Sequence, residues 1–233
     1  IPAYWRIGMT ATPGEPQDKN RRLLEAVTGP VFHEIGAMDL VEQGFLAKPM
    51  IYFHRFVHSQ RYANWQEAKA EGLCGNVDRN KLIAQLAMRE ALRGKKVLVC
   101  VDRVETHGKV LHELLGPTYS MFVHGDSESS VRVAAKRLFE SGKKPILIGT
   151  IYGEGVNMPK MDIVINAIGG KSDRAAIQRF GRVLRVSAGK EYGILYDVMD
   201  EDKAVRGGQG ILKRHSLARE QAYQDEGYPV ETI

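Results

Sequence analysis

Short apolar runs alternate with longer amphipathic stretches between residues 78 and 200. The apolar runs have the length of buried strands, and they are Lys96–Val101, Ser120–Val123, Ile146–Gly149, Ile163–Asn166 and Tyr192–Val198. Stretches with helical periodicity lie between most of these runs. Apolar strands that alternate with helices are typical of a parallel sheet covered on both faces. The pattern predicts an α/β domain over residues 78–200.

The rest of the chain divides into three further parts. Residues 1–57 contain a strand, a polar turn, two helices and a second strand at Ile51–Val57. Residues 58–77 are polar and contain two glycines, which predicts a linker that begins with a helical stretch. Residues 201–233 predict a tail with one helix near Ile211–Asp225. We therefore expect one principal domain, a smaller amino-terminal piece, a linker and a helical tail.

Composition narrows the possible functions. The chain has 233 residues, is 43% hydrophobic and carries a net charge of +5, so it can bury one good core and suits a phosphate-rich partner. Aromatic residues make up only 8%, which does not favour extensive base stacking. Cys74 and Cys100 lie far apart without a C-x-x-C pair, so neither a zinc site nor a disulfide framework is predicted. No apolar run approaches 18 residues and no signal-peptide pattern occurs, so we expect a cytoplasmic protein without a membrane segment.

One octet is the most informative segment for function. It reads Gln-Arg-Phe-Gly-Arg-Val-Leu-Arg and spans residues 178–185. If the octet is helical, Arg182 and Arg185 lie one turn apart on one face. Two guanidinium groups on one face suit the charge that develops on a transferring phosphoryl group. Gln178 lies one turn before Arg182 and can point the same way. The alternative is a solvated basic helix with no site on it.

Three upstream segments accompany the octet. Residues 145–159 are a strand followed by a glycine-rich loop, residues 95–115 are a buried strand followed by an amphipathic helix, and His124-Gly125-Asp126 follows a short strand. Together with the octet, and in their order along the chain, these segments resemble motifs IV, IVa, V and VI of superfamily 2 helicases. Residues 6–13 resemble motif III. The sub-group they resemble is the DNA repair and recombination type, similar to phage recombination helicases and to the XPB and type III restriction translocase branch.

The resemblance implies a RecA-like second helicase domain at 78–200 and a remnant of the first RecA-like domain at 1–57. It also implies site residues. Arg182 and Arg185 correspond to arginine fingers, and Gln178 to a residue that orients water or contacts the γ-phosphate of ATP. The residues implied to face the nucleotide are Gly153, Glu154, Gly155 and Asn157, where Asn157 replaces the aspartate of many relatives. The residues implied to contact nucleic acid are Thr150, Arg103, Gly125, Lys171 and Ser172. Because the resemblance is to DNA-directed helicases, the expected nucleic acid is DNA. The residues implied to couple hydrolysis to domain closure are Thr10 and Thr12.

The chain lacks the phosphate-binding half of such an enzyme. A Walker A loop ending at Gly169-Gly-Lys-Ser172 would need a glycine at position 165, which is Ile165. The acidic run at 200–202 follows motif VI, so its place in the order is wrong for Walker B. We expect motifs I and II to precede Ile1 in a longer parent. ATP and Mg²⁺ would then bind only together with that missing first domain, and the chain alone would not hydrolyse ATP.

Two other interpretations remain open. The chain could be a non-catalytic module that binds nucleic acid or a partner through its basic face. It could also be an excised folding unit with no independent activity. A longer parent that contains a Walker A loop would favour the helicase.

Overall fold

The computed structural model describes residues 4, 7–10, 17–150, 161–171, 173–187 and 189–233. Within these residues, seven strands form one sheet in the order β3-β4-β2-β5-β6-β1-β7, and every pair of neighbours is parallel. The strands are β1 (Lys48–Val57), β2 (Val97–Cys100), β3 (Ser120–Val123), β4 (Ile146–Gly149), β5 (Ile163–Asn166), β6 (Tyr192–Glu201) and β7 (Val230–Thr232). The predicted α/β parallel sheet is confirmed.

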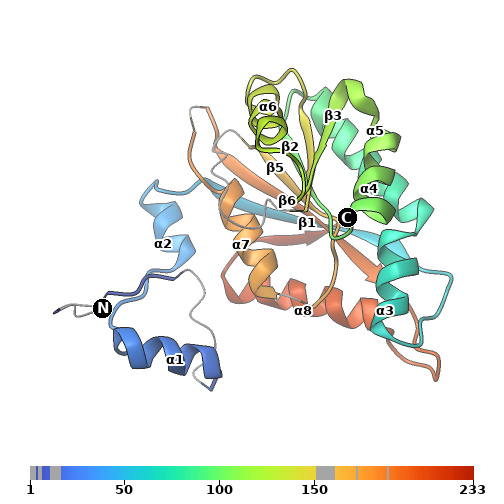
Figure 1. Cartoon of the computed structure of the whole chain (residues 1–233). Helices are drawn as coiled ribbons and strands as arrows, with labels where there is room; N and C mark the ends of the chain where they lie inside the picture. The colour runs from blue at the N-terminus through green and yellow to red at the C-terminus, as the bar shows by residue number, and fades with distance from the viewer. Residues whose placement is uncertain (1–3, 5–6, 11–16, 151–160, 172, 188) are drawn as a thin grey trace.

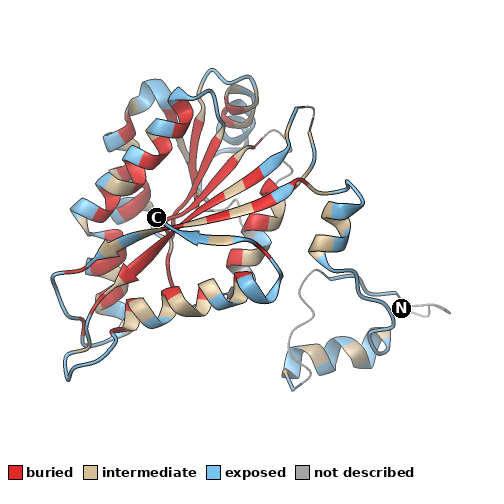
Figure 2. Ribbon diagram, turned by 180° about the vertical axis from the view of Figure 1, so that it is seen from behind, coloured by how far each residue is buried: buried red, intermediate tan, exposed pale blue. Residues whose placement is uncertain are grey.

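Helices cover both faces of this sheet (Figure 1). One face carries α4 (Val77–Leu92) and α5 (Val110–Tyr119), the latter preceded by the π-helical turn η2 (Val104–Lys109). The opposite face carries α6 (Ser129–Glu140), α7 (Asp173–Val183) and α8 (Ile211–Asp225). Because side chains alternate along a strand, Val97 and Val99 pack under α4 and α5, while Leu98 packs in the cluster under the other helices. Figure 2 shows the buried residues, in red, concentrated on the strands between the helices.

Strand β1 belongs to this same sheet. It pairs with β6 from Lys48↔Tyr192 to Val57↔Glu201, and β7 pairs with its other side. The sequence pattern placed the strand near Ile51–Val57 with the amino-terminal piece, and that grouping is wrong. Hydrophobic alternation identifies a strand but does not identify its neighbour, so the partner was not visible in the sequence.

The segment predicted as a linker, 58–77, is folded. It contains α3 (Trp65–Glu67) and the π-helix η1 (Ala68–Cys74), in which Leu73 and Cys74 are buried. Asn64 caps the start of α3 by accepting a hydrogen bond from the Glu67 amide at 3.0 Å. This segment therefore packs against the end of the sheet and is not a free connection.

The amino-terminal piece lies to one side of the sheet, as both views show (Figures 1 and 2). It contains α1 (Lys19–Thr28), which is capped by Asp18, and α2 (Ala37–Glu42). In the described part of the chain, neither helix has a buried residue. Ala37 and Met38 contact the edge of the main core, whereas α1 presents an apolar side to solvent. This piece therefore adds little to the main core.

Candidate functional site

Helix α7 presents Gln178 and Arg182. Gln178 is exposed, Arg182 is half-buried, and the two residues are four positions apart on the same helix. Residues at this spacing lie one turn apart on one face of a helix. Phe180 and Val183 are fully buried on the sheet side and fix the rotation of the helix. The structure therefore brings this predicted pair together on one element.

Arg185 does not share that helix face, so the helical argument for Arg182 and Arg185 is wrong. Helix α7 ends at Val183. The Leu184 carbonyl accepts a hydrogen bond from the Ala47 amide at 2.7 Å, and Arg185 forms an isolated antiparallel bridge with Leu46. This pairing takes the backbone out of the helix before Arg185. Arg185 is half-buried on the bridging segment next to the amino-terminal piece.

The carboxyl edge of the sheet gathers four of the predicted nucleic-acid residues. Gly125 follows β3, Thr150 follows β4, Arg103 follows β2, and Lys171 lies in the loop after β5. These four strands are consecutive in the sheet order, so the four loops are neighbours. Gly125, Arg103 and Lys171 are exposed and Thr150 is half-buried. The carboxyl edge of an open α/β sheet is the usual place for ligands.

Local hydrogen bonds shape this edge. The Thr150 amide donates to the Val123 carbonyl at 3.4 Å, which joins the ends of β3 and β4. The His124 amide donates to Ser127 Oγ at 3.0 Å and closes the turn around Gly125. Lys69 pairs with Asp102 at 2.6 Å, beside Arg103. The edge is therefore an ordered series of short loops.

Several predicted residues lie outside the described residues. They are Gly153, Glu154, Gly155, Asn157, Ser172 and Thr12. Thr10 is described, and it is exposed in the segment before α1. The roles predicted for all of these residues stay predictions.

Comparison with known proteins finds similarity to helicases. Residues 78–187 match the helicase conserved C-terminal domain. Over 226 residues the chain is 26% identical to the ATP-dependent DNA helicase uvsW of enterobacteria phage T4, a match that covers 88% of this chain and 45% of the relative. These matches and the parallel sheet support a superfamily 2 helicase C-terminal domain over residues 78–187.

Solved structures agree with this helicase fold. The crystal structure of T4 UvsW aligns with a TM-score of 0.60, covering 80% of this chain and 41% of that one. A fragment of a type I restriction enzyme HsdR subunit from Vibrio vulnificus aligns with a TM-score of 0.69 at 16% identity over 94% of this chain and 42% of that one, which supports the fold alone. The rRNA helicase RRP3 of Eremothecium gossypii is 35% identical over 80 residues, or 33% of this chain and 16% of the relative. The chain thus spans less than half the length of these curated relatives.

The sheet and the helices that cover it also contain two buried ion pairs that the sequence pattern did not reveal. Arg79 pairs with Asp200, and Arg219 pairs with Asp197, all four side chains being at most 1% exposed. Burial alone would raise the pKa of Asp200, but the Arg79 guanidinium and a hydrogen bond from His58 outweigh it and hold the pKa of this carboxyl below its usual range. The sequence did contain a signal for these pairs, because Asp197 and Asp200 lie inside an apolar strand and buried carboxylates require partners.

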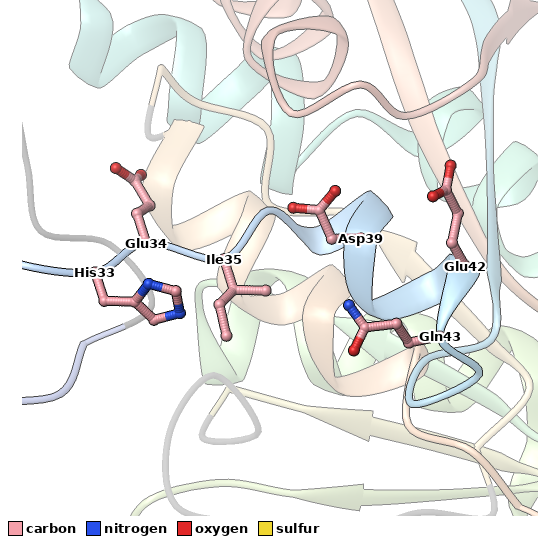
Figure 3. Close-up of a pocket in the computed structure, with 6 residues that line it drawn as sticks. All are labelled: His33, Glu34, Ile35, Asp39, Glu42 and Gln43. Carbon is pink, nitrogen blue, oxygen red and sulfur yellow. The ribbon is translucent and has the colours of Figure 1, made fainter.

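Two cavities among the described residues lie away from the carboxyl edge. One, of about 320 Å³, is lined by His33, Glu34, Ile35, Asp39, Glu42 and Gln43. Figure 3 shows that the three carboxylates on its rim do not converge on a common point. The other, of about 530 Å³, lies at the amino end of β6 beside Lys190, whose pKa burial lowers to about 8. Neither cavity includes a predicted site residue.

The described residues lack two further kinds of feature. Among them, no group of three or more His, Cys, Asp or Glu side chains is placed to hold a metal ion. None of their helices combines the length and the apolar character that crossing a bilayer requires.

Proposed function

We propose that this chain is the carboxyl-terminal half of an ATP-dependent DNA helicase or translocase of the repair and recombination type. The observation that carries the proposal is the placement of Gln178 and Arg182 on one face of α7 within a helicase C-terminal domain. Arg185, on the bridging segment, is proposed as the second cation of the same site. The chain supplies charge to a nucleotide held by a preceding RecA-like domain and does not hydrolyse ATP alone.

The residues present fit part of an ATP site. Two guanidinium groups and an amide suit the γ-phosphate and the attacking water. The described residues hold no acidic cluster for Mg²⁺, and the sequence has no Walker A loop. We propose that a preceding domain supplies the phosphate cradle and the metal ligands. When bound, ATP supplies the phosphoryl group whose hydrolysis drives the cycle. Arg182 and Arg185 would stabilise the charge on that group when the two domains close.

The amino-terminal piece supports a preceding domain. On α1, Leu23, Leu24 and Val27 are 57%, 52% and 58% exposed, and Phe32 and Phe45 are 82% and 66% exposed. A ten-residue helix is marginal in water without a packed apolar face. Several large apolar side chains exposed within one short piece of chain are typical of a surface that another part of the protein covers. We propose that a first RecA-like domain covers them, with Thr10 and Thr12 coupling hydrolysis to closure.

DNA is favoured over RNA by the extent of the likeness. Among the sequence matches, the one to a relative named as a DNA helicase covers 88% of this chain, whereas those to relatives named as RNA helicases cover 33% and 29%. Thr150, Arg103, Gly125, Lys171 and Ser172 are proposed to contact phosphates, because a translocase must bind every sequence equally. Gly153, Glu154, Gly155 and Asn157 are proposed to face the nucleotide. We propose that the protein acts in the cytoplasm of a bacterial or phage-infected cell.

The test measures ATP hydrolysis by the chain alone and after addition of the first RecA-like domain, with single-stranded DNA, forked DNA or single-stranded RNA. We expect hydrolysis only with both domains, and greater stimulation by DNA than by RNA. Arg182→Ala and Arg185→Ala should each lower kcat by about 10³-fold or more, as the loss of an arginine finger does. The exposed Lys81→Ala on α4 is the matched loss of a cation and should leave kcat unchanged.

Three results would contradict parts of the proposal. Hydrolysis by the chain alone would show that the chain itself contains a phosphate-binding loop. Unchanged kcat in both arginine variants would remove the arginine fingers. Tight DNA binding without hydrolysis in the presence of both domains would favour the non-catalytic binding module.

A further inference from the structure

The loop that joins β5 to α7 is held from both faces of the sheet. This 167–170 loop contains Ala167, Ile168, Gly169 and Gly170, and Lys171 follows it. Arg79, from α4 on one face, donates from Nη1 to the Ala167 carbonyl at 2.9 Å. Arg219, from α8 on the opposite face, donates from Nη1 to the Gly170 carbonyl at 2.6 Å. Two buried cations from opposite layers thus meet on one short loop.

Each arginine is itself fixed by a bidentate ion pair. Arg79 Nε and Nη2 donate to the two carboxylate oxygens of Asp200 at 2.7 and 3.1 Å. Arg219 Nε and Nη2 donate to the carboxylate oxygens of Asp197 at 3.0 and 2.9 Å. Both aspartates lie on β6, and because they are three residues apart their side chains point to opposite faces. Strand β6 therefore anchors both arginines.

The guanidinium shape explains why arginine occupies both positions. Its planar fork can engage a carboxylate through two donors and still direct a third donor to a carbonyl. A lysine ammonium keeps the charge but cannot hold both partners in this geometry. Charge neutralisation alone would therefore accept lysine, whereas simultaneous fixation of the loop requires arginine.

Two glycines with positive φ and close neighbours also define the backbone of the 167–170 loop. Gly169 and Gly170 have φ values of 64° and 83°, a region that residues with a Cβ rarely adopt. A Cβ on Gly169 would lie 2.8 Å from Leu73 Cδ1, and a Cβ on Gly170 would lie 3.6 Å from the Trp65 ring. The loop is thus closely packed against the folded 58–77 segment.

We propose that Arg79 and Arg219 are positioning residues that fix the 167–170 loop and thereby set the place of Lys171 at the nucleic-acid edge. The inference rests on the proposed function, because it takes Lys171 as a phosphate contact. Helix α7, which carries Gln178 and Arg182, begins at Asp173, three positions after Gly170. The arginines therefore act on nucleic acid only through the loop, and they touch no ligand themselves.

The test is a double-mutant cycle on binding of the full chain to fluorescent single-stranded DNA over a series of salt concentrations. Lys171→Ala should weaken binding by about three- to tenfold and lower the salt slope by about 0.7. Arg79→Lys and Arg219→Lys should weaken it by a similar factor. In a Lys171→Ala background the same substitutions should cause no further loss, because the contact they position is already gone.

Tyr223→Phe is the matched control. The Tyr223 hydroxyl donates to Asp197 Oδ2 at 2.9 Å, so its loss perturbs the same buried carboxylate without removing a bond to the loop. We expect this variant to lower Tm and to leave DNA binding unchanged. All variants are measured below the onset of their own unfolding transitions.

The outcomes separate the two ideas. If the Lys171→Ala variant binds DNA as tightly as wild type, Lys171 does not contact phosphate. That result would overturn this part of the proposed function and the positioning role together. If Lys171→Ala weakens DNA binding but both arginine variants bind like wild type, the positioning role alone is overturned. It is also overturned if the losses of binding free energy in the single variants add up in the double variants. If neither arginine variant folds, backbone ¹⁵N order parameters of Gly169 and Gly170 in the wild-type chain decide. Values near ~0.85 support a fixed loop, and values below ~0.6 overturn it.

Discussion

Asp200→Ala should be among the most destabilising single substitutions in this domain. The carboxylate is 1% exposed and accepts two hydrogen bonds from Arg79, whose side chain is fully buried. It also contacts His58 Nε2 at 2.9 Å. Removing it leaves a buried guanidinium without its counter-charge, which costs about 3–5 kcal/mol. Since domains are stable by only about 5–15 kcal/mol, this is a large fraction of the total.

Urea unfolding followed by circular dichroism measures the effect, with Glu191→Ala as the control. Glu191 pairs with Lys48 at 3.2 Å, but the two side chains are 65% and 60% exposed, so this loss should stay below about 1 kcal/mol. The double variant Arg79→Ala, Asp200→Ala should lose less than the sum of the two single variants, because neither charge is then left unpaired. A folded Asp200→Ala protein within 1 kcal/mol of wild type would refute the reasoning.

The same carboxyl gives a pH signature. The folded-state pKa of Asp200 lies below its ordinary value of about 3.9. Its contribution to stability is therefore complete above that value and is lost as the pH falls through the lower, folded pKa. Wild type should lose stability below about pH 4 more steeply than Asp200→Ala does. Parallel curves for the two proteins would contradict this assignment.

Three further substitutions test the packing. Gly169 has a φ of 64°, and a Cβ there would overlap Leu73, whereas Gly94 has a φ of 78° and open space around it. Gly169→Ala should therefore lower the free energy of unfolding more than Gly94→Ala does. Equal shifts of the urea midpoint in the two variants would contradict this. Phe180→Ala removes a fully buried ring from α7 and should cost about 3–5 kcal/mol in the same assay. Burial lowers the pKa of His107 to about 3, so its stabilising effect is complete above about pH 6.5 and declines as the pH falls toward 3. His107→Leu should therefore flatten the stability profile between these values, and an unchanged profile would show that His107 does not titrate in this way.

The sheet was predictable because its strands are enclosed on both faces. The predicted strands at Ser120–Val123, Ile146–Gly149 and Ile163–Asn166 have the same bounds as β3, β4 and β5. Each is a continuous apolar run, which is the pattern that a parallel strand under two helical layers must have. The carboxyl-edge loops follow directly, since they are fixed by where those strands end.

The missed features depend on partners distant in the sequence. Arg79 and Asp200 are separated by 121 positions, and nothing local in α4 distinguishes Arg79 from a solvated arginine. Arg185 was misplaced for a similar reason. The octet has good helical spacing, but the Leu46 segment, far earlier in the chain, pairs with the backbone at Arg185 and ends the helix first. Local pattern could not anticipate either pairing.

The bridge between Leu46 and Arg185 has a consequence for the proposed mechanism. It joins the end of α7 to the segment that leads from the amino-terminal piece into β1, and the Ala47–Leu184 hydrogen bond reinforces it. Any domain that packs on the amino-terminal piece therefore acts on a segment bonded to the backbone of a proposed arginine finger. At its other end, α7 begins beside the loop held by Arg79 and Arg219. One helix thus connects the proposed nucleic-acid edge to the place where the preceding domain would act, which is the connection that a motor needs between grip and hydrolysis.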